Sequence, residues 1–207
     1  MSFSLRTCLR NPIPEIFAAA EFLKQAVTAH LEGNQVLATE LIRSADIPAI
    51  TEWSESLWGK GGPWTRPLAV ESPLPFISKE QRVKVRMPNR FEIASLLARD
   101  GFHCRFCGIP LVRAEIRNRI RKTYPEALRW GGKNAEQHAG FQAMWLQYDH
   151  VLPHARGGSN ELTNLVIACA PCNNGRSNLT LEEAGLADPR LREPHRSDWD
   201  GLERFPT

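Results

Sequence analysis

One stretch in the C-terminal half of the chain decides the fold. It holds two runs of strand-forming residues, a Gly-Gly pair between them, and two cysteines directly after the second run. In order it reads Tyr148-Asp149-His150-Val151-Leu152-Pro153-His154-Ala155-Arg156-Gly157-Gly158, then Asn164-Leu165-Val166, then Cys169-Ala170-Pro171-Cys172-Asn173-Asn174-Gly175-Arg176. The first run favours a strand that ends near His150, the Gly-Gly pair permits a tight turn, and residues 164–168 favour a returning strand. The sequence therefore predicts a hairpin that leads into a helix, which is a ββα unit.

Two adjacent polar residues, Asp149 and His150, stand at the end of the first predicted strand. Because neighbouring side chains of a strand point to opposite faces, these two residues must have different tasks. A carboxylate is a hard oxygen ligand that suits Mg²⁺ or Mn²⁺. A neutral imidazole, with an ordinary pKa of about 6.5, can take a proton from water at physiological pH.

Four of the five cysteines form two pairs with the same spacing, Cys104 with Cys107 and Cys169 with Cys172. In a reducing compartment, two C-x-x-C pairs predict a tetrahedral zinc site, because each pair can direct two thiolates at one ion. The alternatives are a redox-active C-x-x-C pair and cysteines buried by coincidence, and a second pair at the same spacing argues against both. Cys8 is left over and is expected to be an ordinary thiol.

The remaining sequence divides into parts of different composition. Residues 1–59 have apolar positions at helical spacing and predict three short helices in a small bundle. Residues 60–78 are rich in Gly and Pro and are expected to be a linker. Residues 79–188 hold the ββα unit and both cysteine pairs, with added helices, and residues 189–207 are expected to be a tail that wraps the surface. The predicted fold class is α+β, with a small helical bundle followed by a zinc-stapled ββα domain.

Positive charge is concentrated in the middle of the chain. Residues 79–133 hold 14 Lys and Arg against 5 Asp and Glu, whereas residues 1–78 and 134–207 have net charges of −2 and −4. This distribution favours a surface for a polyanion, although a solvated helix explains any single charge as well. Residues 82–87 alternate basic and apolar side chains, as an extended arm or an edge strand would. The region between Cys107 and Asp149, which includes the arginine-rich stretch 113–122, is expected to contribute helices on the same side.

The composition excludes several classes of protein. The 207 residues are 42% apolar and 24% charged, with a mean hydropathy of −0.36, which excludes disorder throughout and a collagen-like or low-complexity chain. No stretch approaches the roughly 18 consecutive apolar residues of a spanning helix. The N-terminus lacks the apolar region and cleavage site of a secretory signal. We therefore expect a cytoplasmic location and no membrane partner.

Taken together, the motifs resemble those of the HNH endonuclease family. That family has Asp-His, a Pro and Gly-Gly loop, an Asn before a short strand, and a C-x-x-C followed at once by His or Asn. The resemblance covers about residues 90–180 and implies a ββα-metal nuclease. It implies that His150 is the general base that activates water for attack on a phosphodiester, and that Asp149 and Asn173 hold one divalent ion. Asn164 would fix the loop and the orientation of His150 without touching the metal.

The resemblance also implies cofactors, a substrate and further contacts. Zn²⁺ would be structural, on Cys104, Cys107, Cys169 and Cys172, and the catalytic ion would be Mg²⁺ or Mn²⁺, because Asn173 supplies oxygen where the family often has His. Double-stranded DNA is the expected substrate. Arg176 would contact phosphate, with a structural salt bridge as the alternative, and His154 would assist metal or phosphate binding or have no role. Further nucleic-acid contacts are expected from the basic arm, at Lys84, Arg86 and Arg90.

Three functions are compatible with these residues. The first is a metal-dependent DNA endonuclease. The second is a zinc-stabilised nucleic-acid-binding module without cleavage activity, although such a module has no need of Asp149, His150 and Asn173 together. The third is the nuclease subunit of a larger assembly, such as a bacterial anti-phage defence system. In that assembly the helical and slightly acidic segment 1–78 would dock a regulatory protein.

Overall fold

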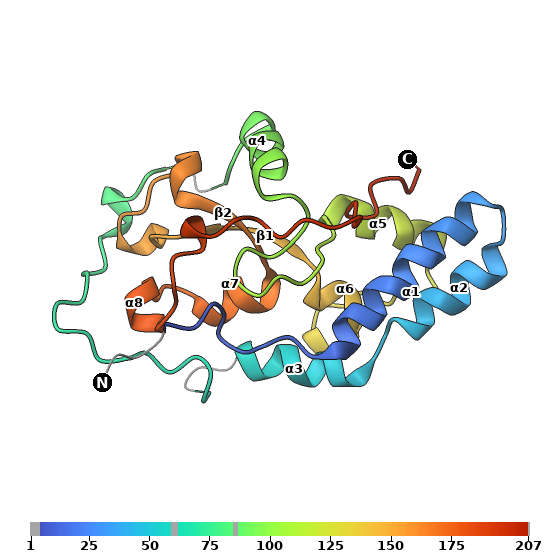
Figure 1. The fold of residues 1–207 in the computed structure, drawn as a ribbon, viewed down its shortest axis with the longest axis horizontal. Coiled ribbons are helices and arrows are strands. Elements are labelled where there is room, and N and C mark those ends of the chain that lie inside the picture. The colour runs from blue at the N-terminus through green and yellow to red at the C-terminus, as the bar shows by residue number, and fades with distance from the viewer. Residues whose placement is uncertain (1–4, 59–61, 85–86, 207) are drawn as a thin grey trace.

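The computed structural model describes residues 5–58, 62–84 and 87–206, and its fold combines many helices with one small sheet (Figure 1). The predicted α+β class is therefore confirmed. Three helices come first and a hairpin followed by a helix comes later, in the order that the sequence predicts. The elements are α1 (Pro14–Leu31), α2 (Gln35–Ser44), α3 (Pro48–Trp58), α4 (Arg90–Asp100), α5 (Ala114–Thr123), α6 (Ala139–Ala143), β1 (Leu146–His150), β2 (Leu165–Cys169), α7 (Ala170–Arg176) and α8 (Leu181–Ala184).

The helical bundle confirms the three helices predicted for the first sixty residues. Pro14 begins α1, at a position where the missing N–H leaves no hydrogen bond unmade. The Asn34 side chain accepts a hydrogen bond from the Leu37 amide at 3.1 Å and so caps α2. In the bundle, α1 and α2 pack side by side (Figure 1).

The hairpin and α7 form the predicted ββα unit. β1 and β2 are antiparallel, and their register pairs Leu146 with Cys169 and His150 with Leu165. α7 begins at Ala170, directly after β2, and packs against both strands. α4 contacts β2 and begins with a capping box, in which Asn89 caps the first turn and Glu92 bonds back to the Asn89 amide.

A single hydrophobic core joins the bundle to the ββα unit. Its buried side chains come from positions between Cys8 and Phe205, and α3 packs against α6 and α7. Two glycines on these helices lie against bundle backbone. A Cβ atom at Gly140 would be 2.7 Å from the Ala45 carbonyl oxygen, and one at Gly175 would be 2.7 Å from the Leu57 carbonyl oxygen. The predicted boundary after residue 59 therefore divides the sequence but not the core.

The segment predicted to be a linker is bonded to the ββα side of the molecule. The Leu68 amide donates to the Glu183 carbonyl at 2.7 Å, and the Ile77 amide donates to the Ala155 carbonyl at 3.0 Å. We call residues 74–84 the strap. Residues 82–87 are predicted to be an extended arm or an edge strand. The described part of that segment forms no strand, and the Val83 carbonyl accepts a hydrogen bond from the His154 side chain.

The C-terminal segment is anchored by its apolar side chains. Trp199, Leu202 and Phe205 are buried, and the Trp199 indole donates to the Leu111 carbonyl at 2.9 Å. The chain ends near α5, at the end of the molecule opposite α8 (Figure 1). Within the described ranges, no helix has both the length and the apolarity to cross a membrane.

Candidate active site and metal centre

The ββα unit brings the predicted catalytic residues to one cleft. Asp149 and His150 end β1, and Asn173 lies in the first turns of α7. All three side chains line a cleft of about 910 Å³. A second wall of the cleft is formed by residues of the strap and by Met87. The cleft is lined by Gln147, Tyr148, Asp149, His150, Pro153, His154, Ala155, Asn173, Asn174, Ser177 and Asn178 on the ββα side, and by Phe76, Lys79, Glu80, Arg82, Val83, Lys84 and Met87 on the other.

His150 is held by a residue that the sequence reasoning missed. Its imidazole Nε2 lies 2.7 Å from the Oδ1 atom of Asn160, and the residue is 6% exposed. Because Oδ1 can only accept a hydrogen bond, Nε2 is the donor in this contact, and a neutral ring would then have its lone pair on Nδ1. The only sequence signal for Asn160 was an amide in the hairpin loop, where polar residues are common.

Asp149 forms a buried ion pair with Arg176. The guanidinium Nη2 is 2.6 Å from Oδ1 and Nε is 3.2 Å from Oδ2, and the Arg176 side chain is 1% exposed. The other donors of Arg176 reach the backbone carbonyls of His150, Val151 and Leu179. Burial raises the pKa of Asp149, and the positive charge of Arg176 opposes that rise. This placement favours the structural salt bridge over the phosphate contact predicted for Arg176.

The side chains of Asp149 and Asn173 suit a hard divalent cation. Each carboxylate oxygen of Asp149 accepts one hydrogen bond from Arg176 and retains a second lone pair. The half-buried Asn173 amide has no hydrogen-bond partner among the described residues, and both residues line the cleft. One carboxylate and one amide oxygen are ligands that Mg²⁺ accepts while it keeps several water molecules. The residues present therefore fit Mg²⁺ or Mn²⁺.

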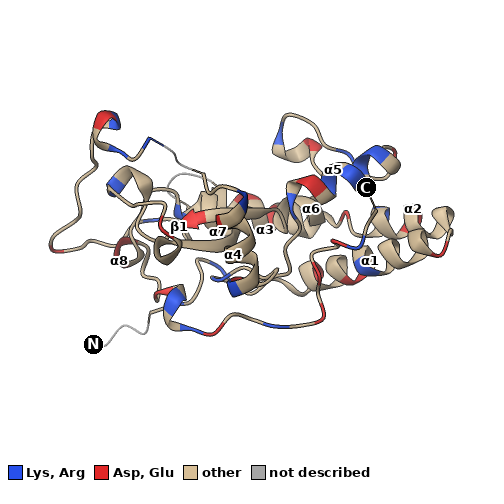
Figure 2. Ribbon diagram, turned by 90° about the horizontal axis from the view of Figure 1, so that it is seen from above, with Lys and Arg blue, Asp and Glu red and all other residues tan. Residues whose placement is uncertain are grey.

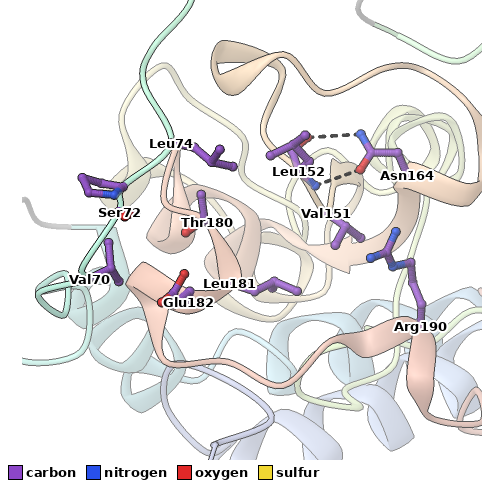
Figure 3. A pocket seen from close by; sticks show the side chains of 11 residues that line it. Val70, Ser72, Leu74, Val151, Leu152, Asn164, Thr180, Leu181, Glu182 and Arg190 are labelled. Atoms are coloured by element: carbon purple, nitrogen blue, oxygen red, sulfur yellow. Dashed lines mark hydrogen bonds between the residues drawn. The ribbon is translucent and has the colours of Figure 1, made fainter.

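Asn164 closes the loop that follows β1. Its Oδ1 atom accepts a hydrogen bond from the Leu152 amide at 2.8 Å, and its Nδ2 atom donates to the Leu152 carbonyl at 3.1 Å (Figure 3). Nδ2 also donates to the Ser159 carbonyl at 2.9 Å. The side chain lies in a small pocket of about 260 Å³ on the far side of this loop, and it is not among the residues that line the cleft. These are the contacts that a loop-fixing role requires.

The four paired cysteines converge on one point. Their sulfur atoms all lie within 4.8 Å of one another, and the Cys107 and Cys169 sulfurs are 3.7 Å apart. Four ligands at about 2.3 Å from a tetrahedral zinc ion would be about 3.8 Å from each other, which agrees with that separation. The two pairs come from the loop after α4 and from the junction of β2 and α7. The cysteines are thus positioned to bind a metal such as zinc, whereas Cys8 lies outside the cluster.

The predicted nucleic-acid contacts are only partly brought together. Lys84 is exposed and lines the cleft. Arg90 is exposed at the start of α4, where its guanidinium lies 4.6 Å from the centre of the Phe91 ring, and it is not among the cleft residues. Arg86 lies outside the described residues.

The arginine-rich stretch 113–122 does not reach the cleft. It forms α5, which lies with α1 and α2 at the end of the molecule away from α8 (Figures 1 and 2). Arg113 pairs with Glu203 at 2.6 Å, and Arg117 is buried with its guanidinium 3.6 Å from the centre of the Trp130 ring. Arg113 and Arg117 thus pack against the C-terminal segment and the loop around Trp130, whereas Arg121 and Lys122 are exposed. A nucleic-acid contact by this helix stays a prediction.

A comparison with known families identifies part of the chain. Residues 139–185 match a family model described as HNH endonuclease. The match runs from α6 to just beyond α8 and includes Asp149, His150, Asn173 and the second cysteine pair. The bundle, the strap and the first cysteine pair lie outside it. The comparisons found no matching curated protein and no matching solved structure.

Proposed function

We propose that this protein is a metal-dependent endonuclease that hydrolyses DNA phosphodiester bonds. One observation carries the proposal: an imidazole, a carboxylate and an amide from a single ββα unit line one cleft, inside the segment that matches the HNH endonuclease model. This combination provides a base for water and oxygen ligands for a cation, which are the parts that phosphodiester hydrolysis needs.

In this proposal His150 is the general base. Because Nε2 donates to Asn160, Nδ1 is the ring atom that accepts a proton from the attacking water. Asp149 and Asn173 hold Mg²⁺ or Mn²⁺, and Arg176 keeps the Asp149 carboxylate in one orientation. When bound, the cation neutralises a non-bridging phosphate oxygen and stabilises the leaving 3′-oxygen.

The basic residues of the strap provide the phosphate contacts. Lys79, Arg82 and Lys84 line the same cleft as His150, so a DNA backbone in the cleft would meet both the cations and the base. Arg90, at the start of α4, and Arg86 are proposed to extend this footprint. Double-stranded DNA is the proposed substrate, as the family resemblance implies, and a supercoiled plasmid provides it for the test.

The cysteine cluster is proposed to hold one structural Zn²⁺. Four thiolates with no open position form a closed site, which contributes to folding and not to chemistry. Cysteines that are not joined in disulfides are typical of a reducing compartment. The proposed location is therefore the cytoplasm.

The test is incubation of the purified chain with supercoiled plasmid and Mg²⁺, Mn²⁺ or EDTA, together with a zinc assay. We expect metal-dependent nicking, about one zinc per chain, and no nicking by His150→Ala. Cys172→Ser should lose zinc and unfold, whereas Cys8→Ser, outside the cluster, should keep both. A chain that binds DNA and zinc but never cuts would instead be the alternative, a zinc-stabilised binding module.

The regulatory partner on residues 1–78 and the role in anti-phage defence stay predictions, supported by the slight negative charge of that segment. In the structure, one face of the bundle is already covered by α6 and α7. A partner would therefore bind the faces of α1 and α2 that these helices leave open. Robust cutting by a chain that runs as a monomer would argue against such a partner.

A further inference from the structure

The strap is fastened to the loop that carries His154, Ala155 and Arg156. The His154 imidazole donates from Nε2 to the Val83 carbonyl at 2.8 Å, and the Ile77 amide donates to the Ala155 carbonyl at 3.0 Å. The Arg156 guanidinium donates to the Leu74 carbonyl and pairs with Glu183 at 2.9 Å. These bonds hold the strap as a fixed second wall of the cleft.

This second wall carries three basic side chains against one acidic side chain, Glu80, and it is also partly apolar. Beside Lys79, Arg82 and Lys84 it presents three apolar side chains that are largely exposed, Phe76 at 59%, Val83 at 46% and Met87 at 57%. The Phe76 ring is held from one side by Arg156, whose guanidinium carbon is 3.8 Å from the ring centre. Arg156, whose side chain is only 7% exposed, therefore covers one face of the Phe76 ring. The exposed face of the ring is the opposite one.

The side chains of this wall suit duplex DNA and an unpaired strand differently. The outside of a duplex presents phosphates, sugars and base edges, and its base faces are stacked inside. An unpaired strand presents phosphates and base faces together, and proteins bind it with cations beside aromatic rings on which the bases stack. Three exposed apolar side chains have no counterpart on a phosphate backbone, but they suit the faces of unpaired bases.

We propose that the cleft takes an unpaired DNA strand, with a base stacked on Phe76 and its phosphates on the strap cations. This inference rests on the proposed function and narrows its substrate from duplex DNA to a single-stranded or locally opened segment. His154 acts as a positioning residue, because its bond to Val83 holds the strap against the cleft.

The first experiment compares affinities for one sequence in three forms: single strand, blunt duplex, and duplex with an unpaired internal segment. Fluorescence anisotropy with full-length His150→Ala measures binding without cleavage. We expect the single strand and the opened duplex to bind at least about tenfold more tightly than the blunt duplex, in line with stacking of one or more bases.

The second experiment tests the ring itself. Phe76→Ala should weaken single-strand binding by about 5-fold to 100-fold, the loss expected for one stacked base, and Phe76→Tyr should restore it. Phe76→Ala should leave the salt dependence of binding unchanged, whereas Lys84→Ala should flatten it. Phe17→Ala is the matched control, since Phe17 is 47% exposed on α1 and does not line the cleft.

Each outcome separates this inference from the nuclease function. Equal or tighter binding of the blunt duplex, or an unchanged affinity of Phe76→Ala for the single strand, overturns the inference. Phe76→Ala could instead lower the affinity for duplex DNA and remove a bend from the bound duplex. The ring would then be a wedge between paired bases, and this result also overturns the inference. If the protein still cuts DNA in a metal-dependent way in these cases, the proposed nuclease function is supported and only the inference fails. If the protein prefers the single strand but never cuts, the proposed nuclease function fails and the inferred binding mode is supported.

Discussion

At the scale of single residues, the proposed general base depends on Asn160. Asn160→Ala should lower kcat by about 10-fold to 100-fold with little change in KM, because the imidazole loses its fixed tautomer and orientation. Asn160→Asp places a carboxylate beside His150, which favours the charged ring and should move the acid limb of the pH–rate profile to higher pH. Initial rates of plasmid nicking against pH measure both effects. Wild-type rates in both variants would show that the contact with Asn160 does not matter for the reaction.

The pair between Arg176 and Asp149 is expected to matter for stability. Arg176→Ala leaves the Asp149 carboxylate buried without a partner, which should lower the free energy of unfolding by about 3–5 kcal/mol. The matched control is Arg190→Ala, because Arg190 pairs with Asp188 at an exposed site and should contribute less than about 1 kcal/mol. Urea unfolding of the two variants makes the comparison, and similar losses would contradict the buried-pair interpretation.

At the scale of secondary-structure elements, His138 joins α2 to α6. Its Nε2 atom donates to the Ile42 carbonyl at 2.8 Å, and its Nδ1 atom accepts from the Phe141 amide at 3.4 Å. Burial lowers the pKa of His138. Since the unfolded chain gains this proton at about pH 6.5 and the folded chain only at lower pH, stability should be lost as the pH falls below that value.

The measurement is the free energy of unfolding at pH 7.5 and at pH 5.5 for the wild type and for His138→Gln. Gln can offer one donor and one acceptor but does not titrate. The wild type should therefore lose more stability between the two pH values than the variant. Equal losses would assign the pH dependence to other groups.

Local elements were predictable because their signals are local. The hairpin and the helix that follows it each depend on residues close together in the chain, and each was predicted. The partners of Asp149 and His150 were not predicted, because Arg176 and Asn160 come into contact with them only when the hairpin and α7 fold. The partners of the α5 arginines were not predictable for a related reason: charge in a sequence does not tell which arginines become partners of Glu203 or Trp130.

At the scale of the whole molecule, the close contact between α3 and α7 joins the bundle to the ββα unit. Gly175→Ala would bring a Cβ atom within 2.7 Å of the Leu57 carbonyl oxygen, so the helices must separate. We expect a loss of about 1–3 kcal/mol in unfolding free energy, the usual cost of overpacking. Gly132→Ala is the control, because a Cβ atom at Gly132 meets nothing within 4 Å. Unfolding monitored by tryptophan fluorescence measures both, and equal stabilities would mean that the two helices separate at no cost.

The cysteine cluster also sets an order of events during synthesis. Cys107 and Cys169 are 62 positions apart in the chain, so at about 5–20 residues per second the ribosome makes the second pair several seconds after the first. Until the second pair has been made, the thiols of Cys104 and Cys107 lack their partners, and the cleft also lacks Asn173 and Arg176. The proposed activity can therefore begin only after the chain has been made through Arg176.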